Sequence, residues 1–203
     1  HRKTKITTTN SRHGLPKHPN LIRDIIPSRP NQIWAADITY IFLAHGVCYL
    51  ASLIDVYTKK IRGWAIMGTL SVELVMAALE SALLNSTAPE YHHSDKGSQY
   101  CAIIYVGKLA KAGIRISMSE TGEHTQNPYA ESFFRTLKVE EVYLKEYETM
   151  QDAKVNITEF IEAVYTKKRL HASLGYQTPE EFEEAWTLST NHVSLKSINT
   201  ARA

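Results

Sequence analysis

Three acidic side chains, those of Asp37, Asp95 and Glu131, stand at positions where a carboxylate could do chemistry. Asp37 interrupts the run 33–42, whose two alternating faces are otherwise largely apolar, so this run predicts a central strand. A bare carboxylate there is costly and requires protonation, a basic partner or a metal ion. Two carboxylates from strands and one from a helix suit divalent cations, because Mg²⁺ takes carboxylate and phosphate oxygens.

Asp95 and Glu131 each have a simpler interpretation. Asp95 follows a short apolar run in a turn shaped by Gly97, where an Asp turn or a helix N-cap would suit an aspartate. Glu131 opens a predicted helix that carries Arg135 and Lys138 on the same face, so a surface ion pair of little energetic consequence is the alternative. The residues alone leave both alternatives open.

Rate arithmetic favours metal ions if the substrate is a phosphodiester. One positioned general base supplies about 10² to 10⁴ in rate, roughly 3 to 5 kcal/mol, whereas enzymes commonly lower barriers by about 8 to 23 kcal/mol. In a two-metal site one ion activates the attacking oxygen and the other stabilises the leaving oxygen. Cations would also relieve the buried charge of Asp37.

Other residues with metal-ligating chemistry have structural explanations that we favour. His92 and His93 end a predicted strand, where packing beside the acidic turn is expected over metal ligation. Asp55 lies at a turn and is expected to be structural. Cys48 and Cys101 lack ligand spacing, so they predict neither a disulfide framework nor a zinc site and suit a reducing compartment.

Hydrophobic periodicity predicts an α/β domain, a mixed sheet with helices on its faces. The first three strands follow one another closely enough to form an antiparallel meander. The expected strands are 33–44, 47–56, 60–68, 90–93 and 114–118. The expected helices are 71–86, a segment ending near 112, 127–145, 149–168 and a short helix that begins at Thr178, followed by a polar tail.

Charge is distributed unevenly along the 203 residues, whose formal net charge is +2. Residues 1–30 carry seven Lys or Arg and one acid, whereas the remainder has a net charge of −4. We therefore divide the chain into a basic arm or linker (1–30), a core with its C-terminal helices (31–186) and a polar tail (187–203). The arm is expected either to lie along phosphates or to be a solvated tail.

The apolar runs predict no membrane span, because acidic residues interrupt or flank them before they reach the roughly 18 apolar residues of a spanning helix. No signal peptide is evident. We therefore expect a cytoplasmic protein, and the start at His1 predicts a segment of a longer chain.

Four motifs together resemble the integrase-type catalytic core of bacterial insertion-sequence transposases, the DDE group related to retroviral integrases. Thirty-five residues separate Asp95 from Glu131, the spacing that gives this group its D,D(35)E name. The motifs are Trp-Ala-Ala-Asp-Ile-Thr-Tyr (34–40), His-Ser-Asp-Lys-Gly-Ser-Gln-Tyr (93–100), Asn-Pro-Tyr-Ala-Glu-Ser-Phe-Phe-Arg-Thr-Leu-Lys (127–138) and Arg-Leu-His-Ala-Ser-Leu-Gly-Tyr-Gln-Thr-Pro (169–179).

The resemblance implies a ribonuclease H-like fold, a mixed five-stranded sheet flanked by helices. It implies that Asp37, Asp95 and Glu131 hold two Mg²⁺ or Mn²⁺ ions for DNA cleavage and strand transfer. In that chemistry water attacks a phosphodiester at a transposon end, and the released 3′-hydroxyl then attacks another DNA phosphate. The implied DNA contacts are Lys138, Arg135, Lys96, Arg169 and His171, with solvated charge or packing as the alternative for each.

The implied partners are transposon ends, target DNA and further copies of the chain in a bacterial, nucleoid-associated assembly. No helix-turn-helix pattern precedes residue 31, so recognition of the ends is expected from an upstream region or a separate chain. The family often has Asp-Asn ahead of its glutamate, where this chain has Gln126 and Asn127, which affects a secondary polar contact. Two other functions remain open: a ribonuclease H-like nuclease that only hydrolyses, and a repurposed core that binds DNA without cutting it.

Overall fold

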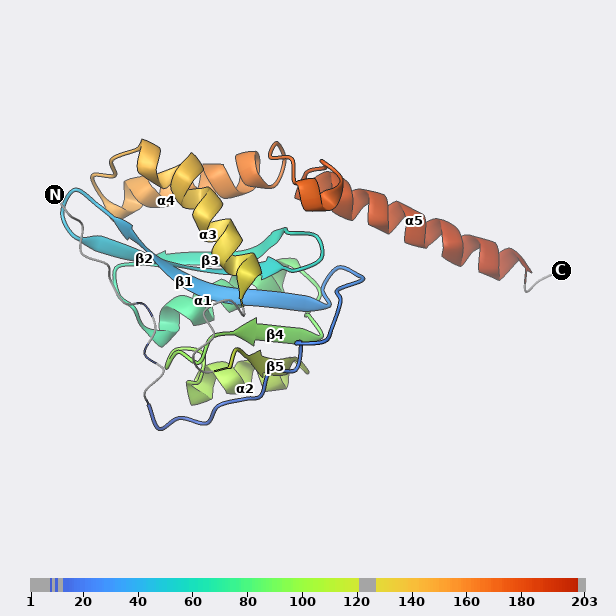
Figure 1. Cartoon of the computed structure of the whole chain (residues 1–203), viewed down its shortest axis with the longest axis horizontal. Coiled ribbons are helices and arrows are strands. Elements are labelled where there is room, and N and C mark those ends of the chain that lie inside the picture. Colours follow the sequence, from blue (N-terminus) through green and yellow to red (C-terminus); the bar gives the residue numbers. More distant parts are fainter. Residues whose placement is uncertain (1–7, 9, 11–12, 121–126, 201–203) are drawn as a thin grey trace.

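The computed structural model describes residues 8, 10, 13–120 and 127–200. The strands are β1 (Ile33–Phe42), β2 (Val47–Asp55), β3 (Ile61–Met67), β4 (Tyr91–Ser94) and β5 (Arg115–Met118). They form one sheet in the order β3-β2-β1-β4-β5, with β1 at its centre (Figure 1). β1, β2 and β3 are antiparallel neighbours, whereas β4 is parallel to both β1 and β5. The predicted mixed five-stranded sheet is confirmed.

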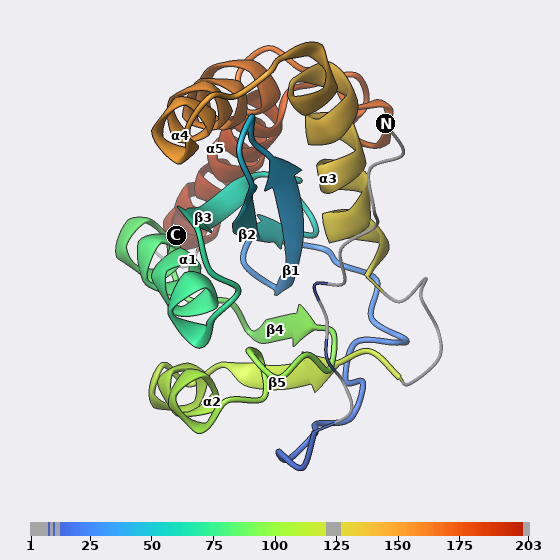
Figure 2. The ribbon, with the colours of Figure 1, turned by 90° about the vertical axis from the view of Figure 1, so that its left-hand side faces the viewer.

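Helices cover both faces of this sheet (Figure 2). α1 and α2 pack on one face and α3 and α4 on the other, each pair with its own apolar core. A π-helical turn, Phe160–Tyr165, continues α4. The helices are α1 (Val72–Asn85), α2 (Ile103–Lys111), α3 (Pro128–Glu140), α4 (Met150–Glu159) and α5 (Pro179–Thr200). None of those in the described part of the chain is long and apolar enough to cross a membrane.

The central strand β1 is apolar on both faces because both faces are covered. Ile33 and Ile41 belong to the core beneath α3 and α4, whereas Trp34 and Ile38 belong to the core beneath α1 and α2. Strand alternation places Asp37 on the same face as Ile33 and Ile41. The carboxylate of Asp37 therefore projects on the side of the sheet that α3 covers.

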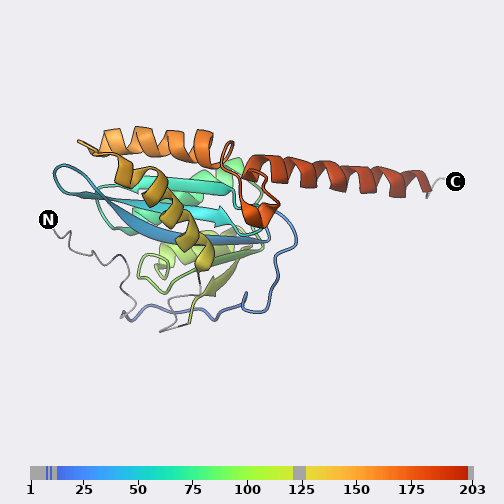
Figure 3. The same ribbon diagram turned by 45° about the horizontal axis from the view of Figure 1, so that its top comes forward.

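The last helix differs from its prediction. The sequence predicts a short helix followed by a polar tail, but α5 runs to Thr200 and leads away from the sheet (Figure 3). Its start is a capping box, in which Glu181 N donates to Thr178 Oγ1 at 3.2 Å and Thr178 N donates to Glu181 Oε2 at 2.9 Å. The helix continues because neither glycine nor proline follows Pro179.

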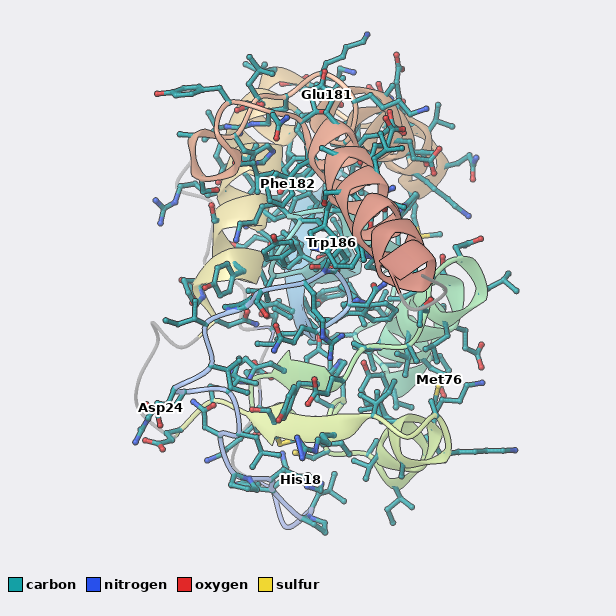
Figure 4. The ribbon with its side chains drawn as sticks, turned by 90° about the vertical axis from the view of Figure 1, so that its right-hand side faces the viewer. His18, Asp24, Met76, Glu181, Phe182 and Trp186 are labelled. Atoms are coloured by element: carbon teal, nitrogen blue, oxygen red, sulfur yellow. The ribbon has the colours of Figure 1, made fainter. Side chains whose placement is uncertain are left out.

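Two contacts attach the beginning of α5 to the meander. The ring of Phe182 lies 5.3 Å from the ring of Tyr57, and Glu183 accepts a hydrogen bond from Lys60 at 2.8 Å and another from Arg62. Figure 4 shows Phe182 and Trp186 one turn apart on this helix. These contacts hold the first turns of α5, where Phe182, Glu183 and Trp186 are half-buried.

Residues 13–30 of the basic arm form neither helix nor strand, and they run beside β5 (Figure 2). Met118 N donates to the Pro19 carbonyl oxygen at 3.1 Å, and Leu21 N donates to Ser117 Oγ at 2.9 Å. Arg29 pairs with Glu90 at 2.6 Å. This part of the arm is therefore packed on the core. The contact of the arm with phosphates remains a prediction, and residues 1–7, 9, 11 and 12 of the arm lie outside the described residues.

Candidate active site

Asp37 is a half-buried carboxylate in the middle of β1. Its Oδ1 accepts a hydrogen bond from the Ile38 backbone N–H at 2.8 Å. Burial, followed by the negative charge of Asp95, raises the pKa of Asp37 to about 7; Glu131 adds to this rise, whereas the Ile38 hydrogen bond and Lys138 oppose it. The side chain therefore lies among an excess of negative charge, and a cation there would stabilise its ionised form.

Asp95 directly follows β4, where the parallel register between β1 and β4 brings it toward Asp37. Ala35 pairs with His93, and Asp37 and Asp95 each lie two residues further along the chain, so a continuation of this register would place them side by side. Asp95 Oδ1 accepts a hydrogen bond from Gly97 N at 2.8 Å. The aspartate is thus both the turn residue that the sequence allows and a near neighbour of Asp37.

Glu131 lies in the first turn of α3 and its side chain is exposed. It lines a cavity of about 350 Å³ together with Asp37, Arg135 and Lys138. The spacing of Glu131, Arg135 and Lys138 keeps them on one helical face, as predicted. The surface ion pair that the sequence allowed between Glu131 and Arg135 is not among the ion pairs that the described residues form.

The three carboxylates are electrostatic neighbours, yet they do not form a closed ligand set. Among residues 8, 10, 13–120 and 127–200, no three His, Cys, Asp or Glu side chains are arranged to hold a metal ion as they stand. Their chemistry nevertheless fits Mg²⁺ or Mn²⁺, because all three offer carboxylate oxygens and Asp37 lacks enough positive charge nearby. Because Glu131 is exposed, its side chain is the one with freedom to turn toward the aspartates.

Models of the integrase core domain match residues 27–124 and 112–179 of this chain. An insertion element IS600 protein of 31 kDa from Shigella sonnei is 40% identical over 182 residues, which cover 88% of this chain and 67% of that protein. The chain belongs to the integrase core family. Transposase InsF for insertion sequence IS3A, from Escherichia coli K12, is 36% identical over 84% of this integrase core and 60% of its own length.

Solved structures agree on the fold. A chain of the simian T-cell lymphotropic virus intasome in complex with PP2A regulatory subunit B56 gamma has a TM-score of 0.64 at 16% identity, covering 87% of this integrase core and 61% of that chain. The HTLV-2 integrase catalytic core domain in complex with magnesium has a TM-score of 0.59 at 13% identity. The match covers 76% of this integrase core and 97% of that chain. The expected ribonuclease H-like fold is confirmed.

Three basic residues predicted to contact DNA lie around the carboxylates of this integrase core. Lys138 is half-buried, with Nζ 4.6 Å from the centroid of the Tyr40 ring, and burial lowers its pKa although Asp37 opposes the shift. Arg135 is exposed on the same helix. Lys96 adjoins Asp95, and its carbonyl oxygen lies 2.9 Å from His13 Nε2. Lys138 and Arg135 line the cavity, and all three DNA contacts remain predictions.

Arg169 and His171 lie apart from that cavity. Arg169 forms an ion pair with Glu140 at 2.9 Å, at the far end of α3 from Glu131. The His171 ring packs edge-on against Tyr165, with the centroids 5.0 Å apart, and burial lowers its pKa to about 4. These contacts match the packing alternative for the motif, while their DNA contact is a prediction that nothing here tests.

The remaining residues with metal-ligating chemistry are structural, as predicted. His92 is fully buried with Nε2 2.9 Å from the Tyr105 hydroxyl, and burial lowers its pKa to about 3. His93 Nδ1 lies 2.9 Å from Ser117 Oγ. Asp55 is fully buried and accepts a hydrogen bond from Arg62 at 2.7 Å.

Two residues near the carboxylates were not predicted as functional. Asn127, at the N-cap of α3, donates from Nδ2 to the Ala36 carbonyl oxygen at 2.8 Å, and Tyr143 lines the cavity. The position of Asn127, four residues before Glu131, was a signal for a helix start. The sequence offers no signal for the contact with Ala36, which joins segments far apart in the chain.

Proposed function

We propose that this integrase core is the catalytic part of a transposase, which cleaves DNA at transposon ends and transfers the released strands to target DNA. The observation that supports the proposal is that Asp37 on β1 and Glu131 on α3 line one cavity, while Asp95 follows β4 in the parallel register that leads toward Asp37. Residues 31–186 constitute the catalytic unit in this proposal. Because the chain spans 67% and 60% of the two relatives, the activity of the whole protein belongs to the proposal too.

Two divalent ions, Mg²⁺ or Mn²⁺, would be held by Asp37, Asp95 and Glu131. When bound, such ions supply activation of the attacking oxygen and stabilisation of the leaving oxygen. The chain contributes rigidity: Asp37 pairs with Ser52 of β2, and β4 pairs with residues 33–35 just before it, so Asp37 is fixed before DNA arrives. Glu131 is exposed, and its carboxylate would be the third ligand when the cations are bound.

Positive charge beside the carboxylates would bind and orient the reacting phosphate. Lys138 and Arg135 share the cavity with Asp37 and Glu131, and both present their charge along one face of α3. Lys96 adds a positive charge beside Asp95. Such contacts fix the position of the DNA backbone without reading its sequence.

Sequence-specific recognition would therefore come from elsewhere. In this proposal an upstream helix-turn-helix region or a separate chain reads the transposon ends, and several copies assemble on paired ends in the bacterial cytoplasm, at the nucleoid. The structural neighbour that is named as part of an intasome is the observation that motivates this assembly.

A strand-transfer assay tests the proposal against the two other functions. The substrates are oligonucleotide duplexes that copy the element's own pre-cleaved ends, together with a supercoiled plasmid and Mg²⁺ or Mn²⁺. Joined products are expected. An active preparation that hydrolyses the ends without joining them would favour a nuclease, and DNA binding without cleavage or joining would favour a repurposed core.

A further inference from the structure

A second cavity opens beside the candidate active site. It has a volume of about 670 Å³ and lies between the end of β1 and the chain that follows α3. Its aromatic lining comprises Tyr40, Phe42, Tyr143 and Tyr147, and we call it the aromatic recess. Its volume falls within the roughly 300 to 1,000 Å³ of small-molecule sites, so it can hold one nucleotide.

The aromatic recess adjoins the active-site cavity, with which it shares two lining residues. Lys138 and Tyr143 line both, so a strand whose phosphate lies beside Asp37 and Glu131 would reach the recess within a short distance. The Lys138 ammonium lies 4.6 Å from the centroid of the Tyr40 ring, and Lys138 lines both cavities. That charge suits a backbone phosphate as the strand passes from one cavity to the next.

The recess is lined by charges of both signs. Lys138 and Lys145 line the recess with Glu146, although Lys145 already pairs with Glu141 at 3.0 Å. The aromatic rings differ in how exposed they are to a stacking base. Tyr143 is 70% exposed, whereas Tyr147 is buried and its hydroxyl donates to Glu141. Tyr143 is thus the ring that is available for stacking, and Tyr147 forms a fixed wall.

Aromatic walls beside a basic residue favour an unpaired base. In a duplex the base faces are stacked on one another, and only base edges reach the grooves, so aromatic side chains stack on bases that are splayed out or single-stranded. We propose that the aromatic recess binds an unpaired DNA nucleotide adjacent to the reacting phosphate, with its base stacked on Tyr143. This inference rests on the proposed function, because it takes DNA to be the substrate.

The binding test uses fluorescently labelled oligothymidylate as the single strand and a blunt duplex of equal length, both at one fixed low ionic strength. Tyr143→Leu is expected to weaken binding of the single strand by about tenfold and to change duplex binding little. Tyr143→Trp is expected to keep or strengthen the single-strand affinity. The matched control is Tyr176→Leu, because Tyr176 is 73% exposed and lines neither cavity.

Three outcomes would overturn the inference: no binding of oligothymidylate by the wild type, equal losses in Tyr143→Leu and Tyr176→Leu, or an equal loss on the duplex. Circular dichroism of each variant verifies folding, which is expected because the Tyr143 side chain is mostly exposed. The strand-transfer assay keeps the two hypotheses separate. If the wild type joins DNA and Tyr143→Leu binds oligothymidylate with wild-type affinity, the proposed role of the aromatic recess is refuted and the transposase function stands. If Tyr143→Leu loses oligothymidylate binding selectively but the wild type joins no DNA, the transposase function is refuted and the nucleotide site stands.

Discussion

The side-chain amide of Asn127 donates a 2.8 Å hydrogen bond to the backbone carbonyl oxygen of Ala36. This bond joins the N-cap of α3 to β1 at the residue before Asp37, and the Asn127 side chain is almost fully buried, at 7% exposure. Glu131 lies one turn after Asn127 on the same helix. The hydrogen bond therefore fixes the position of Glu131 relative to Asp37.

Replacing Asn127 is expected to impair activity beyond its effect on stability. In Asn127→Ala the buried Ala36 carbonyl loses its side-chain donor, which costs about 1 to 3 kcal/mol of unfolding free energy. Strand transfer should fall by on the order of 10²-fold, because a shift of about 1 Å in a catalytic group has that effect. Denaturant titration and the strand-transfer rate measure the two effects.

Asn85→Ala is the control for this pair of measurements. Asn85 Nδ2 donates to the Ser81 carbonyl oxygen at 2.9 Å within α1, on the other face of the sheet from α3, so its loss should leave the rate unchanged. If Asn127→Ala lost only stability and joined DNA at the wild-type rate, Asn127 would have no positioning role.

In the metal-free protein, the contribution of Asp37 to stability is expected to fall as pH rises. The pKa of Asp37 is about 7 in the folded chain and 3.8 ordinarily, so between these values the folded state binds more protons than the unfolded state. The Asp37 contribution to the unfolding free energy therefore falls across this range, by on the order of a few kcal/mol. Burial lowers the pKa of His92 and of His171, and these two groups add stability as pH rises, so the difference between Asp37→Asn and the wild type isolates the Asp37 contribution. Asp37→Asn should remove that fall and should be more stable than the wild type above pH 7. Denaturant titrations with a chelator across the pH range measure it.

The exposed carboxylate of Asp24 supplies the control for the pH experiment. Asp24→Asn should show the wild-type dependence on pH. A metal-free Asp37→Asn protein that is less stable than the wild type above pH 7 would assign Asp37 a structural role instead.

Lys138 is expected to bind backbone phosphate. Lys138→Gln should weaken binding to DNA of any sequence and reduce the slope of log affinity against log salt by about one. Lys138→Arg should restore much of the affinity, because it retains the charge. Fluorescence anisotropy over a salt series measures the slope, with Lys111→Gln on α2 as an exposed control. An unchanged slope in Lys138→Gln would rule out the phosphate contact.

The absence of a side chain at Gly63 on β3 is expected to be required for α1 to pack closely on the sheet. A Cβ at this position would lie closer than 3.0 Å to the Ala78 carbonyl oxygen and to Ala82 N, both in the backbone of α1. Gly63→Ala should therefore cost about 1 to 3 kcal/mol or more of unfolding free energy. Gly107→Ala, inside α2 with open space around it, should instead stabilise by about 0.5 to 1 kcal/mol. Thermal unfolding measures the stability of each variant against the wild type. Equal stabilities of Gly63→Ala and Gly107→Ala would refute the packing argument.

Local patterns in the sequence were sufficient for the strands and for the order of the elements. Closely spaced apolar runs predicted the meander, and the four motifs that resemble the family predicted which carboxylates lie near Asp37. Helix ends were harder to predict where tertiary contacts set them. The helix expected over 127–145 ends at Glu140, where Arg169 pairs with Glu140 and the buried Glu141 accepts a bond from Tyr147.

Features built from distant segments left no pattern in the sequence. The bond from Asn127 to Ala36 spans 91 residues, and the arm contacts β5 through Pro19 and Met118. The aromatic recess likewise combines Tyr40 with Tyr143, which only the packing of α3 on β1 brings to one cavity. Each of these depends on the completed fold, so periodicity and motif spacing could not reveal them.

The most direct test of the central claim is the strand-transfer rate of Glu131→Gln in Mg²⁺ with pre-cleaved ends. The exchange removes one ligand charge from an exposed side chain, so the variant should fold and bind DNA as the wild type does. The account predicts metal-dependent joined product from the wild type and none from Glu131→Gln. Joining at the wild-type rate by Glu131→Gln would contradict it.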